Sequence, residues 1–296
     1  MTSFRKIIFV FAMLVFAAIP FALAQGTYTQ IDVPQALLTA VNGIDSAGDL
    51  VGVYEDASNA YHGFLSSNGL FTTIDYPGAQ RGTYLNGIND VGQIVGYAPQ
   101  GFSEVSFLYE LQSQTFTRLR NLGSDQPFVT SINNAGTIAG YFPAQTGGTR
   151  TVGFDLIGLT YSRILPPGQF QAWAYAISGS GEVIGDTETN KGSNINFSFS
   201  DGKYKPIVIP NSPSAGITGV NNLGTALVGY YGNSSSCPTC SFVYQNGTVQ
   251  LLVFPGSVDT SATGVNDAGV VVGSFTDSSN NVHGFTWAPP TPIPKK

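Results

Sequence analysis

Few residues in this chain have the types and spacing that redox chemistry or metal binding requires. Cys237 and Cys240 frame a Cys-Pro-Thr-Cys motif, the spacing of redox-active dithiols and of half a zinc site. A redox dithiol usually relies on a helix N-terminus to lower the thiol pKa, and a zinc site needs further ligands beyond two cysteines. The sequence offers neither nearby, so we expect a local disulfide, with redox and zinc chemistry as the alternatives.

The chain has 2 histidines, His62 and His283, each followed by Gly-Phe. We expect each to lie at the start of a strand and to form hydrogen bonds close by. A shared metal or acid–base site is the alternative, because the two positions match within a repeat. No Ser/His/Asp spacing typical of nucleophilic catalysis accompanies them.

Acidic residues recur in turns of the Asn-Asp-x-Gly kind, namely at Asp45, Asp49, Asp90 and Asp267. Calcium takes six to eight oxygen ligands, usually with several carboxylates in one loop. Asp and Asn side chains also bond their own backbone in tight turns. One or two acids per turn favour turn chemistry over calcium, so the sequence predicts neither a metal nor a cofactor.

These residues are distributed over a repeat. A small residue, an aliphatic residue and a Gly-closed turn recur at Gly43, Gly87, Ser131, Ala176, Gly219 and Gly264, in steps of 44, 44, 45, 43 and 45. A period in the forties that is dense in short strand signals is typical of β-propellers.

Each repeat divides into four strand-like pieces. In the second copy they are 83–89, 93–97, 106–110 and 115–119, rich in β-branched and aromatic residues and separated by Asn, Asp and Gly. Asn68-Gly69, Asp201-Gly202 and Asn246-Gly247 occupy the turn between the third and fourth pieces, where they favour a tight hairpin.

The two ends of the repeat region complement each other. The last copy stops after three strands, and 28–34 matches the fourth strand of copy one at 71–77. A linear array would instead need capping repeats. We therefore predict an all-β fold, a six-bladed β-propeller over 25–288 whose last blade is closed by the N-terminal strand.

The remaining segments predict export. Residues 1–24 hold Arg5 and Lys6, an apolar stretch and Ala-Leu-Ala before Gln25, the pattern of a cleaved signal peptide. No later segment is apolar enough to span a membrane, so we expect none after cleavage. The formal net charge of −6 and the scattered Lys and Arg residues argue against a basic stripe that would bind nucleic acid. Residues 289–296 form a Pro-rich tail.

The connections between strands differ in length on the two ends of a blade. Second-to-third connections (55–60, 98–104, 143–150, 187–195, 231–240 and 276–281) and fourth-to-first connections are long and variable, and both emerge on one face, which we call the long-loop face. Variable loops on a rigid scaffold usually carry function. Candidate ligand-face residues are Trp173, Tyr97, Phe142, Tyr230, Glu104 and Asp186. Their aromatic rings could stack on sugars, and packing between blades is the alternative.

The pattern Gly-Ile-Asn-Asp-x-Gly-x-Ile-Val-Gly at 87–96, with counterparts at 264–273 and the triplets His-Gly-Phe at 62–64 and 283–285, resembles the HAF-type extracellular repeat family of bacteria. The triplet has Gly where the family has Ala, and the His is kept in the first and last copies alone. The resemblance implies an exported β-repeat protein and brings no catalytic residues with it.

The sequence therefore predicts an exported, periplasmic or extracellular, monomeric propeller without catalytic activity. We expect it to bind a ligand or envelope partner through the long-loop face, with a glycan as the first expectation. One alternative is a carbohydrate-active or lactone-hydrolysing propeller enzyme, which would need at least two acids or histidines near the axis. Another is a self-assembling structural surface protein.

Overall fold

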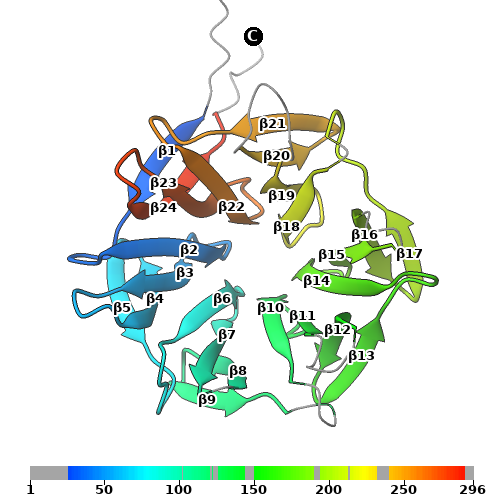
Figure 1. Cartoon of the computed structure of the whole chain (residues 1–296), viewed down its shortest axis with the longest axis horizontal. Coiled ribbons are helices and arrows are strands. Elements are labelled where there is room, and N and C mark those ends of the chain that lie inside the picture. The colour runs from blue at the N-terminus through cyan, green and yellow to red at the C-terminus, as the bar shows by residue number, and fades with distance from the viewer. Residues whose placement is uncertain are drawn as a thin grey trace, which may run out of the picture.

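The computed structural model describes residues 26–101, 103–120, 122, 126–143, 150–189, 194–212, 214–231 and 240–290. These residues form six four-stranded antiparallel sheets arranged as blades around a central axis (Figure 1), which confirms the predicted six-bladed β-propeller. The described part contains strands and turns, and it has no helix long and apolar enough to cross a bilayer. The predicted signal peptide and most of the predicted tail lie outside the described residues.

In blades one to five the strands follow one another in chain order from the axis outward, and in blade six the N-terminal strand is the outermost. Blade one has β2 (Leu38–Ile44), β3 (Leu50–Glu55), β4 (Tyr61–Ser67) and β5 (Leu70–Ile74); blade two has β6 (Tyr84–Ile88), β7 (Gln93–Gln100), β8 (Ser103–Glu110) and β9 (Thr115–Arg118); blade three has β10 (Phe128–Ile132), β11 (Ile138–Phe142), β12 (Val152–Ile157) and β13 (Thr160–Ile164). Blade four has β14 (Gln171–Ile177), β15 (Val183–Glu188), β16 (Asn194–Ser200) and β17 (Lys203–Pro206); blade five has β18 (Gly216–Val220), β19 (Ala226–Tyr230), β20 (Ser241–Gln245) and β21 (Thr248–Leu252). Blade six has β22 (Asp259–Val265), β23 (Val271–Thr276), β24 (Val282–Ala288) and the N-terminal β1 (Thr27–Ile31).

The N-terminal strand closes the ring as predicted. β1 pairs antiparallel with β24, from Thr27 opposite Ala288 to Ile31 opposite Gly284. The Tyr28 ring packs edge-on against Phe254, with centroids 5.5 Å apart, and its hydroxyl accepts a hydrogen bond from the Val253 amide at 3.0 Å. β1 therefore joins blade six to the chain that leaves blade five.

The core lies between the blades. Each of six clusters of buried apolar side chains combines residues of two neighbouring blades. At the centre of each third strand is a phenylalanine with at most 2% of its surface exposed: Phe64, Phe107, Phe154, Phe197, Phe242 and Phe285. Because a single blade cannot bury both of its faces, closing the ring is what removes this apolar surface from water.

A glycine on the second strand faces each of these phenylalanines. Gly140 pairs with Phe154, and a Cβ at Gly140 would lie 2.2 Å from the Phe128 carbonyl oxygen and 2.7 Å from the Phe154 ring. The same pairing recurs at Gly52, Gly96, Gly185, Gly229 and Gly273, where a Cβ would lie 1.9–2.2 Å from a carbonyl oxygen of the first strand. The Val-Gly and Gly-Phe parts of the repeat motif are thus packing signals.

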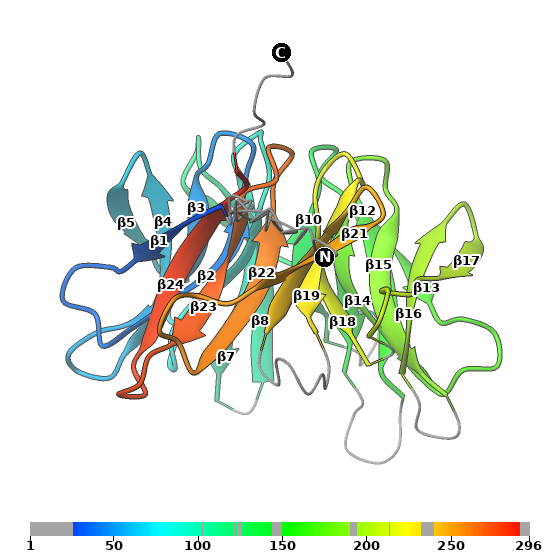
Figure 2. The same ribbon diagram turned by 90° about the horizontal axis from the view of Figure 1, so that it is seen from above.

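The first-to-second turns follow the predicted turn chemistry. The Asn89 side chain accepts a hydrogen bond from the Gln93 amide at 2.9 Å, and Gly92 has φ of 81°, which favours glycine. In blade one, Asp45 accepts from the Asp49 amide at 2.9 Å in the same way. Figure 2 shows strands running between these turns on one face and the long-loop face on the other.

One predicted loop is wrong. Residues 98–104 of blade two continue the ladder between β7 and β8, which pairs Ala98 with Val105 and ends at Gln100 opposite Ser103. The paired Ala98 and Val105 side chains are buried, so extending the hairpin covers additional apolar surface. Glu104 therefore lies on a strand.

Candidate functional site

A β-bulge in the innermost strand of every blade turns one side chain toward the next blade. The register shifts place it at Asn42, Asn86, Thr130, Tyr175, Thr218 and Thr263. In blade one, the Asn42 amide donates to the Leu85 carbonyl at 2.9 Å. Asn86, Thr130, Thr218 and Thr263 each donate in the same manner to the following blade, at 2.7–3.0 Å. The exception is Tyr175.

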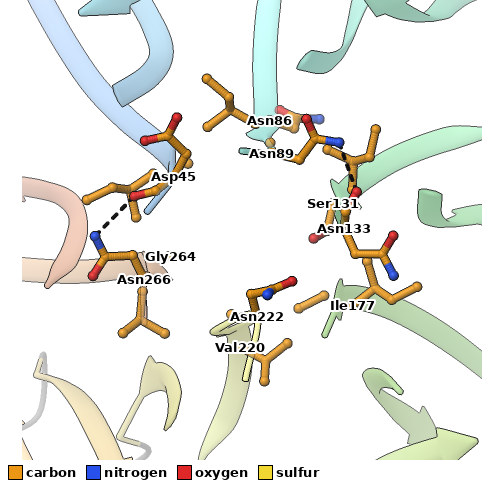
Figure 3. A pocket seen from close by; sticks show the side chains of 18 of the residues that line it. Asp45, Asn86, Asn89, Ser131, Asn133, Ile177, Val220, Asn222, Gly264 and Asn266 are labelled. Atoms are coloured by element: carbon orange, nitrogen blue, oxygen red, sulfur yellow. Dashed lines mark hydrogen bonds between the residues drawn. The ribbon is translucent and has the colours of Figure 1, made fainter. Parts of the chain in front are cut away.

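A cavity of about 90 Å³ lies on the axis, lined by the innermost strands and their turns. Figure 3 shows asparagines around its centre, including Asn86, Asn133 and Asn222. Neighbouring turns are joined there, as by Asn89 donating to the Asn133 carbonyl at 2.9 Å. This volume suits a few water molecules and is well below the roughly 300–1,000 Å³ of small-molecule sites.

Aromatic side chains gather at the other end of the blades, toward the long-loop face. The rings of Tyr61, Tyr84, Tyr97, Phe128 and Tyr141 follow one another with centroid distances of 5.8, 4.8, 4.7 and 5.0 Å. We call these five residues the aromatic arc. It runs from blade one to blade three, and each member is half-buried.

Strand pairing explains why the arc forms. Tyr84 stands opposite Tyr97 in blade two, and Phe128 stands opposite Tyr141 in blade three. Opposed residues in an antiparallel pair point to the same side of the sheet. Burial raises the pKa of Tyr97, and the neighbouring Tyr84 and the Glu104 carboxylate add to that shift. The Tyr97 hydroxyl, which is protonated at neutral pH even at its ordinary pKa, therefore loses its proton still less readily.

Blade four has Trp173 opposite Asp186 at the same pair of positions. Asp186 is 6% exposed, and one of its carboxylate oxygens, Oδ1, has no hydrogen-bond partner among the residues that the structure describes. The side chain of Tyr175, the residue at the bulge, is among the groups that act on the pKa of this carboxylate. Burial raises the pKa of Asp186 to about 6, against the lowering effect of the Tyr175 hydrogen bond.

Blade five contributes Tyr230, which is 49% exposed. Its ring lies directly on the backbone of Gly216, where a Cβ would come within 2.0 Å of it. Burial raises the pKa of Tyr230, and the negative charge of Asp186 adds to this shift. The charge of Asp186 in blade four therefore reaches Tyr230 in blade five.

The sequence-predicted candidates divide into two groups. Tyr97 belongs to the arc, and Trp173, Asp186 and Tyr230 lie together at the next blades around the axis. Glu104 is exposed on β8 and acts on the arc through its charge.

Phe142 does not reach the surface. It is 2% exposed, and its ring packs against Phe154 at 4.7 Å with Arg163 over it at 5.3 Å. Its hypothetical role on the ligand face is therefore wrong, because the neighbouring Tyr141 takes the outward position.

Sequence reasoning missed Tyr61, Tyr84, Phe128, Tyr141 and Tyr175. A signal for some of them was present. The residue after the second-strand glycine is Val53, Tyr97, Tyr141, Asp186, Tyr230 and Ser274 in the successive blades. In this alignment the residue is aromatic or acidic in blades two to five, and it is Val or Ser in blades one and six.

The two histidines form hydrogen bonds within their own blades, as predicted. His62 contacts Asp75 at 2.7 Å and Asp56 at 3.4 Å, and His283 contacts Asp32 at 2.9 Å. Within the described residues, no group of three or more His, Cys, Asp and Glu side chains is arranged to hold a metal ion. Cys237 lies outside the described residues, so the predicted disulfide stays a prediction.

Fold and site together define a six-bladed propeller with an aromatic and acidic surface at one end of its axis. No family model and no curated protein matches the sequence. Among solved structures, a gluconolactonase from Xanthomonas campestris is similar at 14% identity, with a TM-score of 0.55, covering 91% of this chain and 93% of that chain.

Two further solved structures are similar to this chain. AofleA from Arthrobotrys oligospora has 15% identity and a TM-score of 0.56, with 89% of each chain covered. A variant of Aleuria aurantia lectin in complex with α-methyl-L-fucoside has 11% identity and a TM-score of 0.50, covering 90% of this chain and 97% of that chain. At these identities the similarity establishes the fold alone.

Proposed function

We propose that this protein is an exported, non-catalytic propeller of the HAF-repeat type that binds a glycan on its long-loop face. The observation that carries this proposal is the aromatic arc. Half-buried rings that follow one another over three blades present a row of partly exposed aromatic surface against which pyranose rings can pack, while acids beside them accept hydrogen bonds from hydroxyl groups. The Aleuria aurantia lectin, a propeller in complex with a fucoside, is consistent with such a role for the fold.

The experiment is glycan-array screening of the purified protein, followed by calorimetry on the best ligand. Tyr84→Ala and Tyr97→Ala should each weaken binding by about tenfold, since stacking contacts are worth roughly 1–1.5 kcal/mol. Phe71→Ala is the matched control, because Phe71 packs on Phe64 in an outer strand, with ring centroids 5.7 Å apart. Absence of binding on the array, or equal affinity in all three variants, would refute the proposal.

The rival function is a hydrolase that acts on lactones or glycosides. Asp186 favours it, because a buried carboxyl group with a pKa of about 6 suits a general acid or base. The next acid on the strand, Glu188, accepts a hydrogen bond from Gln171 and is not paired with Asp186. Assays with gluconolactone and with aryl glycosides test it: turnover that Asp186→Asn abolishes would favour the enzyme.

A further inference from the structure

Two departures from the repeat coincide in blade four. At the bulge, five blades have Asn or Thr donating to the next blade, and blade four has Tyr175. At the position after the second-strand glycine, where blades two, three and five have tyrosine, blade four has Asp186. These two exceptional side chains act on each other, because each is among the groups that shift the other's pKa. They therefore form one unit that the rest of the ring does not contain.

This unit is costly for the folded protein. A carboxylate that is 6% exposed and has one oxygen without a partner loses solvation that nothing in the described residues replaces. None of the described Lys and Arg side chains is among the groups that act on its pKa. A neutral ligand would leave this buried negative charge without a counterion, whereas a cation would compensate it.

The side chains around Asp186 match an organic cation. Trp173 stands opposite it on β14, and the charge of Asp186 acts on Tyr175 in the same blade and on Tyr230 in blade five. Aromatic faces attract ammonium groups, most strongly where water is excluded. Glu188, two residues further along β15, adds a second negative charge that acts on Asp186. Acid and aromatic rings together form the pattern of an ammonium site.

We propose that Asp186, Trp173, Tyr175 and Tyr230 bind the ammonium group of a cationic amine, so that the preferred ligand is a glycan with unacetylated amino sugars. This inference rests on the proposed glycan binding and specifies the ligand class. The ammonium group pairs with the Asp186 carboxylate, whose Oδ1 has no hydrogen-bond partner among the described residues, and the rings of Trp173 and Tyr230 border it. The neighbouring sugars extend over the aromatic arc.

The test compares three tetrasaccharides near pH 7: glucosamine, N-acetylglucosamine and glucose units, all β-1,4-linked. Calorimetry gives the affinities, and tryptophan fluorescence reports on Trp173, because the other tryptophan, Trp287, is buried at 2% exposure. We expect the glucosamine oligomer to bind about tenfold or more tightly than the other two. Asp186→Asn should remove that preference, so that its affinity for the glucosamine oligomer falls to the level of the other two.

Asp201→Asn is the matched control, because Asp201 lies in the β16–β17 turn of the same blade. It should retain the preference, while Tyr175→Phe should reduce it. Equal binding of the three oligomers by the wild type, or a preference that Asp186→Asn retains, would overturn this inference and leave the proposed glycan binding intact. Absence of binding by all three would overturn both.

Discussion

The middle of each blade and its long-loop end differ in how much their side chains vary from blade to blade. In the middle, glycine faces a buried phenylalanine in all six blades. At the next residue along the second strand, the side chain is Val53 or Ser274 in blades one and six, tyrosine in blades two, three and five, and Asp186 in blade four. The constant layer holds the ring together, and the variable layer is free to differ because less packing depends on it.

Ring closure should be the most sensitive property of the constant layer. Deleting 26–33 removes β1, exposes one edge of β24 and uncovers Phe254 and Phe285, which Tyr28 contacts. We expect a loss of more than about 5 kcal/mol in the free energy of unfolding, enough to unfold much of the protein. Circular dichroism and urea denaturation measure this. A variant that melts within a few degrees of the intact protein would show that closure is dispensable.

A smaller but large effect should come from filling one Gly–Phe contact. Gly140→Ala places a methyl group against the Phe128 carbonyl and the Phe154 ring, so we expect destabilisation of about 2–4 kcal/mol. Gly87→Ala is the control, because its closest contact is 3.3 Å and the equivalent residue in blade four is Ala176. Equal Tm values for both variants would contradict the packing role of the contact.

In the variable layer, Asp186 should make stability depend on pH. Burial raises its pKa from 3.8 to about 6, so the folded protein binds this proton more tightly than the unfolded chain does. Its contribution to the free energy of unfolding should therefore decline as the pH rises from about 4 to about 6, by on the order of 2–3 kcal/mol.

Denaturation of the wild type and of Asp186→Asn across this pH range isolates that contribution. The variant should gain stability relative to the wild type as the pH rises, whereas Asp201→Asn should follow the wild type. Parallel curves for the wild type and Asp186→Asn would show that the carboxyl group titrates normally.

Returning blade four to the pattern of the other blades should raise stability slightly. The double change Tyr175→Thr with Asp186→Tyr replaces the buried carboxylate by a ring and restores the bulge donor, for a gain of about 1–2 kcal/mol. Tyr175→Thr alone should destabilise, because Asp186 then loses its remaining partner. Thermal melts of the single and double variants check this. A double variant less stable than both single ones would mean that the pair serves packing.

The smallest expected effect on stability concerns His62, near the start of β4. Burial tends to lower the pKa of His62, but the Asp75 and Asp56 carboxylates outweigh it and raise this pKa above 6.5. The protonated ring therefore stabilises the fold below pH 6.5, and this contribution is lost as the pH rises through the raised pKa. His62→Gln should lower Tm by roughly 1–2 °C at pH 6 and by less at pH 9. An equal difference at both pH values would rule out the charge effect.

Much of the fold followed from the sequence by itself. The repeat period and its glycines predicted six blades, and the missing last strand predicted closure by the N-terminus. These inferences succeeded because they depend on local turn chemistry and on counting, both of which a linear sequence contains. The longer β7–β8 hairpin was missed because its extension depends on burial of Ala98 and Val105 between blades.

The composition of the candidate site was decided by tertiary structure. Tyr141 and Phe142 are adjacent and similar in type, yet one joins the aromatic arc and the other lies in the core. Side chains alternate between the two faces of a strand, so an error of one residue in register exchanges surface and core. The bulge at Tyr175 shifts that alternation again. The sequence determined which residue types the strands carry, and only the packing of blade against blade decided which of them meet, because those contacts join residues about one whole repeat apart.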